Sequence, residues 1–189
     1  SNDVEELRRL LDEDPGLIEV EDPATPLCIA CTAGSMGATL LLLERGADIN
    51  RMDAGRTSTP LIAASFSGRV EVAALLLQRG ADPSLRNRRG VSALTAAAGG
   101  PVSDGSDHVT VIRLLLKDGR VAVEAPDEYG GRAFLHASYA GFVERARVLL
   151  LEGGVDHTTA DLDGETSLAA AQRLGHRDCV QPVSYTHLT

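Results

Sequence analysis

The chain has 189 residues, of which 43% are hydrophobic and 24% are charged, and its formal net charge is −9. This composition fits one folded domain, and the negative average field excludes a protein whose main partner is a nucleic acid or an anionic membrane. No run of 18 apolar residues occurs, so no membrane-spanning helix is expected. Aromatic residues make up 3% and tryptophan is absent, so the core must consist of Leu, Ala and Val in closely packed helices.

The first predicted element is a helix over residues 3–12, in which Val4, Leu7, Leu10 and Leu11 share one face. This pattern is typical of the second helix of a two-helix unit, and we interpret residues 3–16 as half of such a unit. Because the chain starts at Ser1 without a methionine and the first helix of that unit is missing, we expect the sequence to be a fragment.

From residue 25 onward, one pattern recurs along the chain. A capping or small residue precedes a large apolar residue at intervals of 34 (27 to 61), 33 (61 to 94), 40 (94 to 134) and 34 (134 to 168). An apolar run ending in a glycine turn follows at least four of these positions. The next shared feature is an Asp or Asn shortly before another glycine, at Asp53, Asn87, Asp127 and Asp161. A period near 33 residues predicts a repeat protein.

Residues 59–85 show the local structure of one unit most clearly. Thr59 is suited to cap a helix, and Pro60 fits the first helical position, where a missing N–H costs nothing. Gly68 ends this short helix, a second helix follows over 70–77, and Gly80 is suited to a left-handed turn. Neither helix is long enough to be stable alone, so the units must bury their apolar faces against one another.

The succession Thr-Pro-Leu, Ala, Gly, Val-x-x-Leu-Leu-Leu and Gly-Ala-Asp, clearest from Thr59 to Asp82, resembles the ankyrin repeat. The resemblance covers about residues 3–180. It implies an all-α ankyrin-repeat solenoid of stacked antiparallel helix pairs with projecting turns. The predicted domain, 1–181, comprises the half repeat 3–16, repeats at about 22–53, 54–87, 88–127 and 128–161, and a truncated repeat at 162–181.

Two segments depart from this pattern. Gly100 to Ser106 is an insertion between the two helices of the third full repeat, and its composition predicts a flexible surface loop. Residues 182–189 interrupt the helix expected there and resemble the in-frame translation of a sequencing adapter. We therefore interpret 182–189 as a non-native tail, with a genuine polar tail as the alternative.

The turns and the ends of the first helices are the predicted binding surface, because these regions are exposed in ankyrin repeats. Charges on the turns run from basic to acidic along the chain, which would orient a partner. Exposed aromatic residues are typical anchors in interfaces. The predicted partner-binding residues are Arg51, Met52, Arg56, Phe66, Arg86, Arg88, Arg89, Glu128, Tyr129, Tyr139, Asp161 and Asp163. A merely solvated surface is the alternative for the charged residues.

Other candidate sites have simpler structural interpretations. Cys28 and Cys31 have the spacing of a redox or metal pair, but no second pair exists, and we expect them to pack inside a helix. The context of Asn50 resembles that of hydroxylated ankyrin asparagines, although a turn role is the alternative. His108 and His176 are expected to pack or cap at the inter-helix turns. No catalytic residue, metal site or cofactor is predicted.

The sequence therefore predicts a monomeric protein-interaction module without intrinsic catalysis, whose partner is another protein. Three cysteines and no signal-peptide pattern favour a reducing compartment, the cytoplasm or the nucleus. The alternative is a regulatory or substrate-recognition fragment of a larger enzyme or of a ubiquitin-ligase-type assembly.

Overall fold

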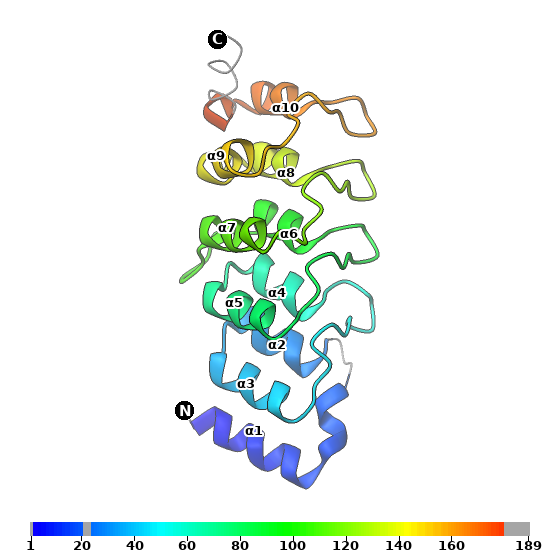
Figure 1. The fold of residues 1–189 in the computed structure, drawn as a ribbon, viewed down its shortest axis with the longest axis vertical. Helices are drawn as coiled ribbons and strands as arrows, with labels where there is room; N and C mark the ends of the chain where they lie inside the picture. Colours follow the sequence, from blue (N-terminus) through cyan, green and yellow to red (C-terminus); the bar gives the residue numbers. More distant parts are fainter. Residues whose placement is uncertain (1, 21–23, 180–189) are drawn as a thin grey trace.

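A computed structural model describes residues 2–20 and 24–179, and the predicted tail at 182–189 lies outside them (Figure 1). These residues form a single elongated stack of helices, without a named strand. The helices in chain order are α1 (Asn2–Glu13), η1 (Pro15–Glu19), α2 (Pro26–Ala33), α3 (Met36–Glu44), α4 (Pro60–Phe66), α5 (Val70–Gln78), α6 (Ala93–Gly99), α7 (His108–Asp118), α8 (Ala133–Ala140), α9 (Val143–Leu151), α10 (Ser167–Leu174) and η2 (Arg177–Cys179).

The helices form two layers. The first helices of the units, α2, α4, α6, α8 and α10, pack on one another in that order. The second layer runs from α1 through α3, α5, α7 and α9 to η2. Thus α1 takes the place of a second helix and packs on α3, as the pattern of residues 3–12 predicts. Each unit contacts mainly its neighbours, so stability is a sum over adjacent pairs.

Local sequence explains where the first helices begin and end. A hydroxyl group at the N-cap accepts a hydrogen bond from the backbone N–H three residues later, at Thr25, Thr59, Ser92 and Thr166. Proline occupies the first helical position of α2 and α4. Left-handed glycines end α2, α8 and α10. The predicted capping of α4 by Thr59 and Pro60 is confirmed.

The core is built from one apolar position repeated in each first helix. Leu27, Leu61 and Leu94 are at most 2% exposed, and Phe134 at the same position is equally buried. Alanines fill much of the remaining space, including four buried alanines in α6. Small side chains allow these short helices to approach closely, which accounts for a core with few aromatic rings.

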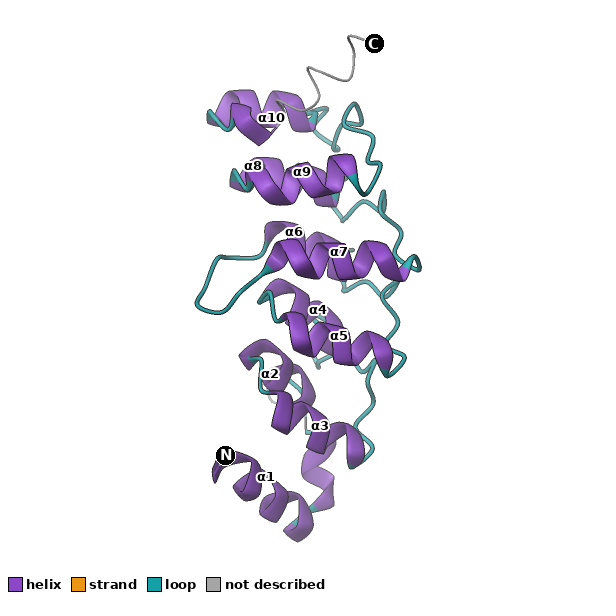
Figure 2. Cartoon of the chain, turned by 60° about the vertical axis from the view of Figure 1, so that its left-hand side comes forward, coloured by secondary structure: helices purple, strands orange, loops and turns teal. Residues whose placement is uncertain are grey.

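The insertion forms a surface loop between α6 and α7, on the side opposite to the turns (Figure 2). It is held at its end by the N–H of Asp107, which donates to the carbonyl of Gly68 at 2.9 Å. The guanidinium of Arg69 donates to the carbonyl of Asp104, also at 2.9 Å. The loop is therefore tied to the preceding unit at both of these positions.

Candidate protein-interaction surface

The turns between units lie side by side and are joined by backbone hydrogen bonds. The N–H of Arg88 donates to the carbonyl of Arg56 at 2.9 Å, and the N–H of Glu128 donates to that of Arg89 at 2.8 Å. Leu162 donates in the same way to Tyr129 at 2.9 Å. The turns thus form a continuous ladder along the edge of the stack (Figure 1), and charged residues from different units become neighbours.

The recurring Asp or Asn residues shape the turns from inside. In Asn87, Asp127 and Asp161, one side-chain oxygen accepts N–H groups two and four residues later, at 2.8–3.0 Å. Asp53 accepts the N–H and the hydroxyl of Thr57. The carboxylate of Asp161, predicted to bind a partner, is therefore engaged within its own turn.

A groove of about 670 Å³ lies between the first helices and two of the turns. We call it the arginine groove, and its lining includes Ile29, Ile62, Ala63, Phe66, Arg88 and Arg89. Phe66 and Ile29 are 49% and 54% exposed, which is unusual for large apolar residues on short core helices. The structure thus brings together Phe66, Arg88 and Arg89 from the predicted set.

Ile29 was missed by the sequence-based prediction, although a signal was present. It occupies the position held by Ala63 in α4 and Ala96 in α6, counted from the N-cap of each helix. A large aliphatic residue at a position otherwise taken by alanine extends beyond the packed layer. Ile29 therefore adds an apolar contact surface next to Phe66.

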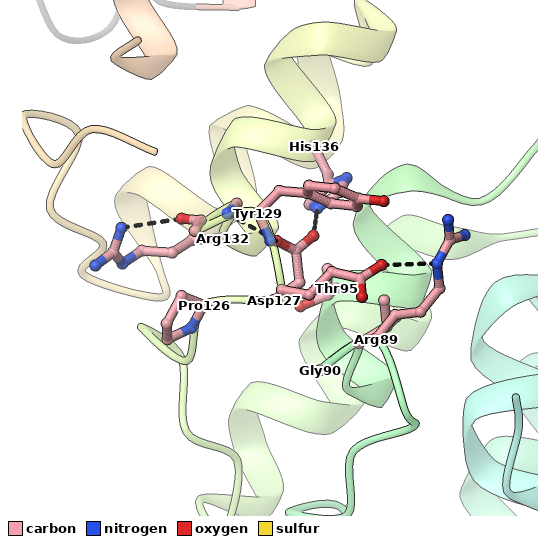
Figure 3. A network of polar contacts seen from close by, with 12 residues as sticks. Arg89, Gly90, Thr95, Pro126, Asp127, Tyr129, Arg132 and His136 are labelled. Atoms are coloured by element: carbon pink, nitrogen blue, oxygen red, sulfur yellow. Dashed lines mark hydrogen bonds and ion pairs between the residues drawn. The ribbon is translucent and has the colours of Figure 1, made fainter. Parts of the chain in front are cut away.

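Two arginines of the second turn are engaged within the protein. Arg89 pairs with Glu128 of the next turn, with 2.9 Å between Nε and Oε1 (Figure 3). Arg86 donates from Nε to the carbonyl of Gly90 at 2.8 Å and from Nη2 to the carbonyl of Pro126. Arg86 therefore braces two turns. The basic-to-acidic gradient along the turns is partly neutralised where the second turn meets the third.

The remaining predicted residues lie away from the arginine groove. Arg51 pairs with Glu19 at 2.9 Å. Met52 and Arg56 line a separate shallow hollow of about 440 Å³. Tyr129 and Asp163 are exposed on the later turns. The structure therefore divides the predicted residues among several surfaces.

Tyr139 is part of a polar cluster at the other end of the stack. Its hydroxyl donates to Glu165, which also pairs with Arg173 at 2.7 Å. Arg173 and, next, the Tyr139 hydroxyl lower the pKa of Glu165 to about 2, so this carboxylate is ionised at neutral pH. Tyr139 thus contributes to contacts between α8 and the following turn.

His136 lies one position after the histidine typical of ankyrin repeats, but it still binds a turn. Its Nε2 is 2.7 Å from Oδ2 of Asp127, whose other oxygen accepts backbone N–H groups of the third turn (Figure 3). The contact positions the third turn against α8.

Two other candidate sites have structural roles. Cys28 and Cys31 are buried, and burial raises the pKa of their thiols to about 11 and 12, which keeps them protonated and unreactive at neutral pH. Their predicted packing role is confirmed by this burial. The Asn50 side-chain oxygen accepts the N–H of Asp82 at 2.9 Å and so links two units. Its hydroxylation stays a prediction.

Within residues 2–20 and 24–179, no three His, Cys, Asp or Glu side chains are grouped so that they could hold a metal ion. In the same part of the chain, none of the helices has the length and apolar character needed to cross a membrane.

Short antiparallel helix pairs, stacked in order and joined by projecting turns, define a helical-repeat solenoid. Residues 1–87 match the model of the family described as ankyrin repeats, in three copies. The same pattern of helix pair and turn continues through α10, so the described part of the chain has the all-α fold of an ankyrin-repeat solenoid. Ankyrin repeats are generally protein-interaction modules, and the family is typically not catalytic.

Proposed function

We propose that this chain is a binding module for another protein and has no intrinsic catalysis. The observation that carries the proposal is the arginine groove, where exposed Phe66 and Ile29 lie beside Arg88 and Arg89. Large apolar side chains next to arginine are the composition of interface hot spots. The linked turns supply a preorganised frame, so little flexibility is lost when a partner binds.

The predicted residues divide into two roles in this proposal. One set contacts the partner directly: the exposed Phe66, Arg88, Tyr129, Asp163 and Arg56, the half-buried Met52, and Arg89, which is exposed although it pairs with Glu128. Residues already bonded within the protein hold the shape of the surface: Arg51, Arg86, Glu128, Tyr139 and Asp161. The charges of the second set still act on the approach of a partner, because electrostatic steering extends beyond contact distance.

Charge reversal on the second turn tests this function. The variant Arg88→Glu with Arg89→Glu is expected to lose captured partners in affinity purification, with an unchanged circular dichroism spectrum. Arg86 is left in place, because its guanidinium bonds two backbone carbonyls. Arg79→Glu with Lys117→Glu, at two exposed positions outside the arginine groove, is the control, because it makes the same change of net charge. Retention of every partner by the Arg88 and Arg89 double variant would contradict the proposal.

We place the module in the cytoplasm or nucleus as a monomer. Ankyrin-repeat proteins are commonly intracellular, and the three cysteines carry free, buried thiols. Size-exclusion chromatography with light scattering measures the oligomeric state, and a dimer at micromolar concentration would contradict this part of the proposal.

A further inference from the structure

We infer that the arginine groove binds an extended peptide in which a bulky apolar residue is flanked by carboxylates. We further infer that Glu128 competes for the same arginine that the peptide engages. This inference rests on the proposed protein-binding function and specifies the chemistry of the partner.

The apolar part of the ligand is inferred from the apolar side chains that line the groove. Ile29 and Phe66 expose about half of their surface, while Ile62 and Ala63, which also line the groove, are at most 7% exposed. The result is a firm apolar surface with two protruding side chains, on helices fixed by hydroxyl caps. A bulky apolar side chain seated between Ile29 and Phe66 would remove their surface from water.

The acidic part of the ligand is inferred from the two arginines at the edge of the groove. Arg88 and Arg89 lie on a turn whose shape is fixed, because the Asn87 side-chain oxygen accepts the N–H groups of Arg89 and Val91 at 2.9 Å. The Asn87 side-chain nitrogen donates to the carbonyl of Thr57 at 2.8 Å. The guanidinium groups are thus presented on a rigid support, which favours charged hydrogen bonds to a carboxylate.

One carboxylate lies among the residues that line the groove. It belongs to Asp53, which is 6% exposed and accepts the N–H and hydroxyl of Thr57. With two arginines and one carboxylate, the residues that line the groove carry a net charge of +1, in a protein whose net charge is −9. A long polyanion would meet the repelling surface around it, whereas a short acidic segment fits within the positive region.

Glu128 already makes the contact that we assign to the ligand. Its Oε1 lies 2.9 Å from Nε of Arg89, and the two side chains are 39% and 59% exposed. An exposed ion pair of this kind adds little stability, so a ligand carboxylate can replace it at small cost. The backbone N–H of Glu128 stays bonded to the Arg89 carbonyl at 2.8 Å, so only the side chain must move.

The test uses a fluorescein-labelled six-residue peptide with Leu-Phe at its centre and two glutamates on each side. Fluorescence anisotropy with the full chain measures its Kd. One control peptide replaces the glutamates by glutamine, another replaces Leu-Phe by Ser-Ser, and a single-stranded oligonucleotide tests for general polyanion binding. We expect the acidic apolar peptide to bind about tenfold more tightly than each control, the value of one charged hydrogen bond.

The decisive variant is Glu128→Gln, which should tighten peptide binding roughly two- to fivefold by freeing Arg89. Its matched control is Glu152→Gln, which releases Arg113 from a similar exposed pair at 3.0 Å, away from the groove. That control should leave the Kd within about twofold. Arg88→Gln and Arg89→Gln should each weaken binding about tenfold.

Three results would overturn the inference. The first is that Glu128→Gln leaves the affinity unchanged or lowers it. The second is that the glutamine peptide or the oligonucleotide binds as tightly as the acidic apolar peptide. The third is that no peptide binds, and this result would still leave the protein-binding function to be decided by partner capture with the Arg88 and Arg89 reversal.

Discussion

Arg145 in α9 is a buried cation that closes the end of a helix in the neighbouring unit. It is 5% exposed and donates to the carbonyls of Ala97, Ala98 and Gly100, at the C-terminal end of α6. The guanidinium also stacks on Phe142, 3.7 Å from the ring centroid. Burial lowers the pKa of Arg145 to about 10, so it remains charged at neutral pH. It thus supplies a positive charge where a helix presents unpaired carbonyls.

Replacing this guanidinium should destabilise the whole stack. Arg145→Met keeps the aliphatic length but leaves the α6 carbonyls without a donor, and we expect a loss of about 2–3 kcal/mol in the free energy of unfolding. Urea denaturation followed by circular dichroism measures it. The control is Arg147→Met on the same helix, where an exposed arginine contacts Glu144 at 3.6 Å and should change stability by less than about 0.5 kcal/mol. Equal losses in both variants would rule out the capping role.

His108 is held as one neutral tautomer by its two neighbours. Its Nε2 lies 2.9 Å from the Phe66 carbonyl and must donate, while its Nδ1 lies 3.1 Å from Nη2 of Arg145 and must accept. Burial lowers the pKa of His108. The bond to the Phe66 carbonyl opposes this shift, and the Arg145 charge adds to it. A proton on Nδ1 would face the guanidinium, so protonation is incompatible with this arrangement.

Stability should therefore fall in mildly acidic solution. Because the folded-state pKa lies below the ordinary value of about 6.5, the unfolded chain binds this proton first. The contribution of neutral His108 to the free energy of unfolding is fully present above about pH 6.5 and is lost as the pH falls below that value. Urea unfolding at pH 7.5, 6.5 and 5.5 should show the decrease. His108→Gln, whose amide can donate and accept but does not titrate, should show a smaller decrease. Parallel slopes for the two proteins would exclude His108 as the titrating group.

Each turn, as an element, needs a left-handed residue at one position. Gly90, Gly130 and Gly164 take φ values of 74°, 79° and 80°, and each donates its N–H to the carbonyl of the Asp or Asn three residues earlier. In the first turn this position is held by Arg56, with φ of 51°. A side chain in this conformation is strained, because its Cβ approaches the following carbonyl. The first turn therefore carries a cost that the others avoid.

Substitutions at these two positions should change stability in opposite directions. Arg56→Gly should stabilise the protein by about 0.5–1 kcal/mol, because it relieves the left-handed strain. Gly90→Ala should destabilise it by about 1–2 kcal/mol or more, because the added Cβ would also lie 3.0 Å from Cα of Asp127. Thermal unfolding of both variants measures the two shifts. A lower melting temperature for Arg56→Gly would show that its side chain contributes more than the strain costs.

At the scale of the whole molecule, the features that the sequence predicted are those encoded within one unit. Thr59, Pro60 and Gly68 act on residues within one turn of helix, so their spacing alone predicts a capped helix and its end. The contact of Arg145 with α6 joins residues 45–48 positions apart and depends on how two units stack. The pairing of Arg89 with Glu128 likewise depends on turn-to-turn register. Periodicity locates the units but does not specify which side chains meet between them.

Because each unit is stabilised by its neighbours, the same substitution should cost more stability in an interior unit than in the last one. Leu61 and Leu94 occupy equivalent positions in interior helices and are at most 2% exposed, whereas Leu168 at that position in α10 is 36% exposed. Leu61→Ala and Leu94→Ala should each cost about 2–5 kcal/mol, and Leu168→Ala less than about 1.5 kcal/mol, because the interior leucines leave a cavity between packed units. Urea unfolding of the three variants measures these losses. If Leu168→Ala costs as much as the interior changes, local helix propensity rather than stacking sets the stability of each unit.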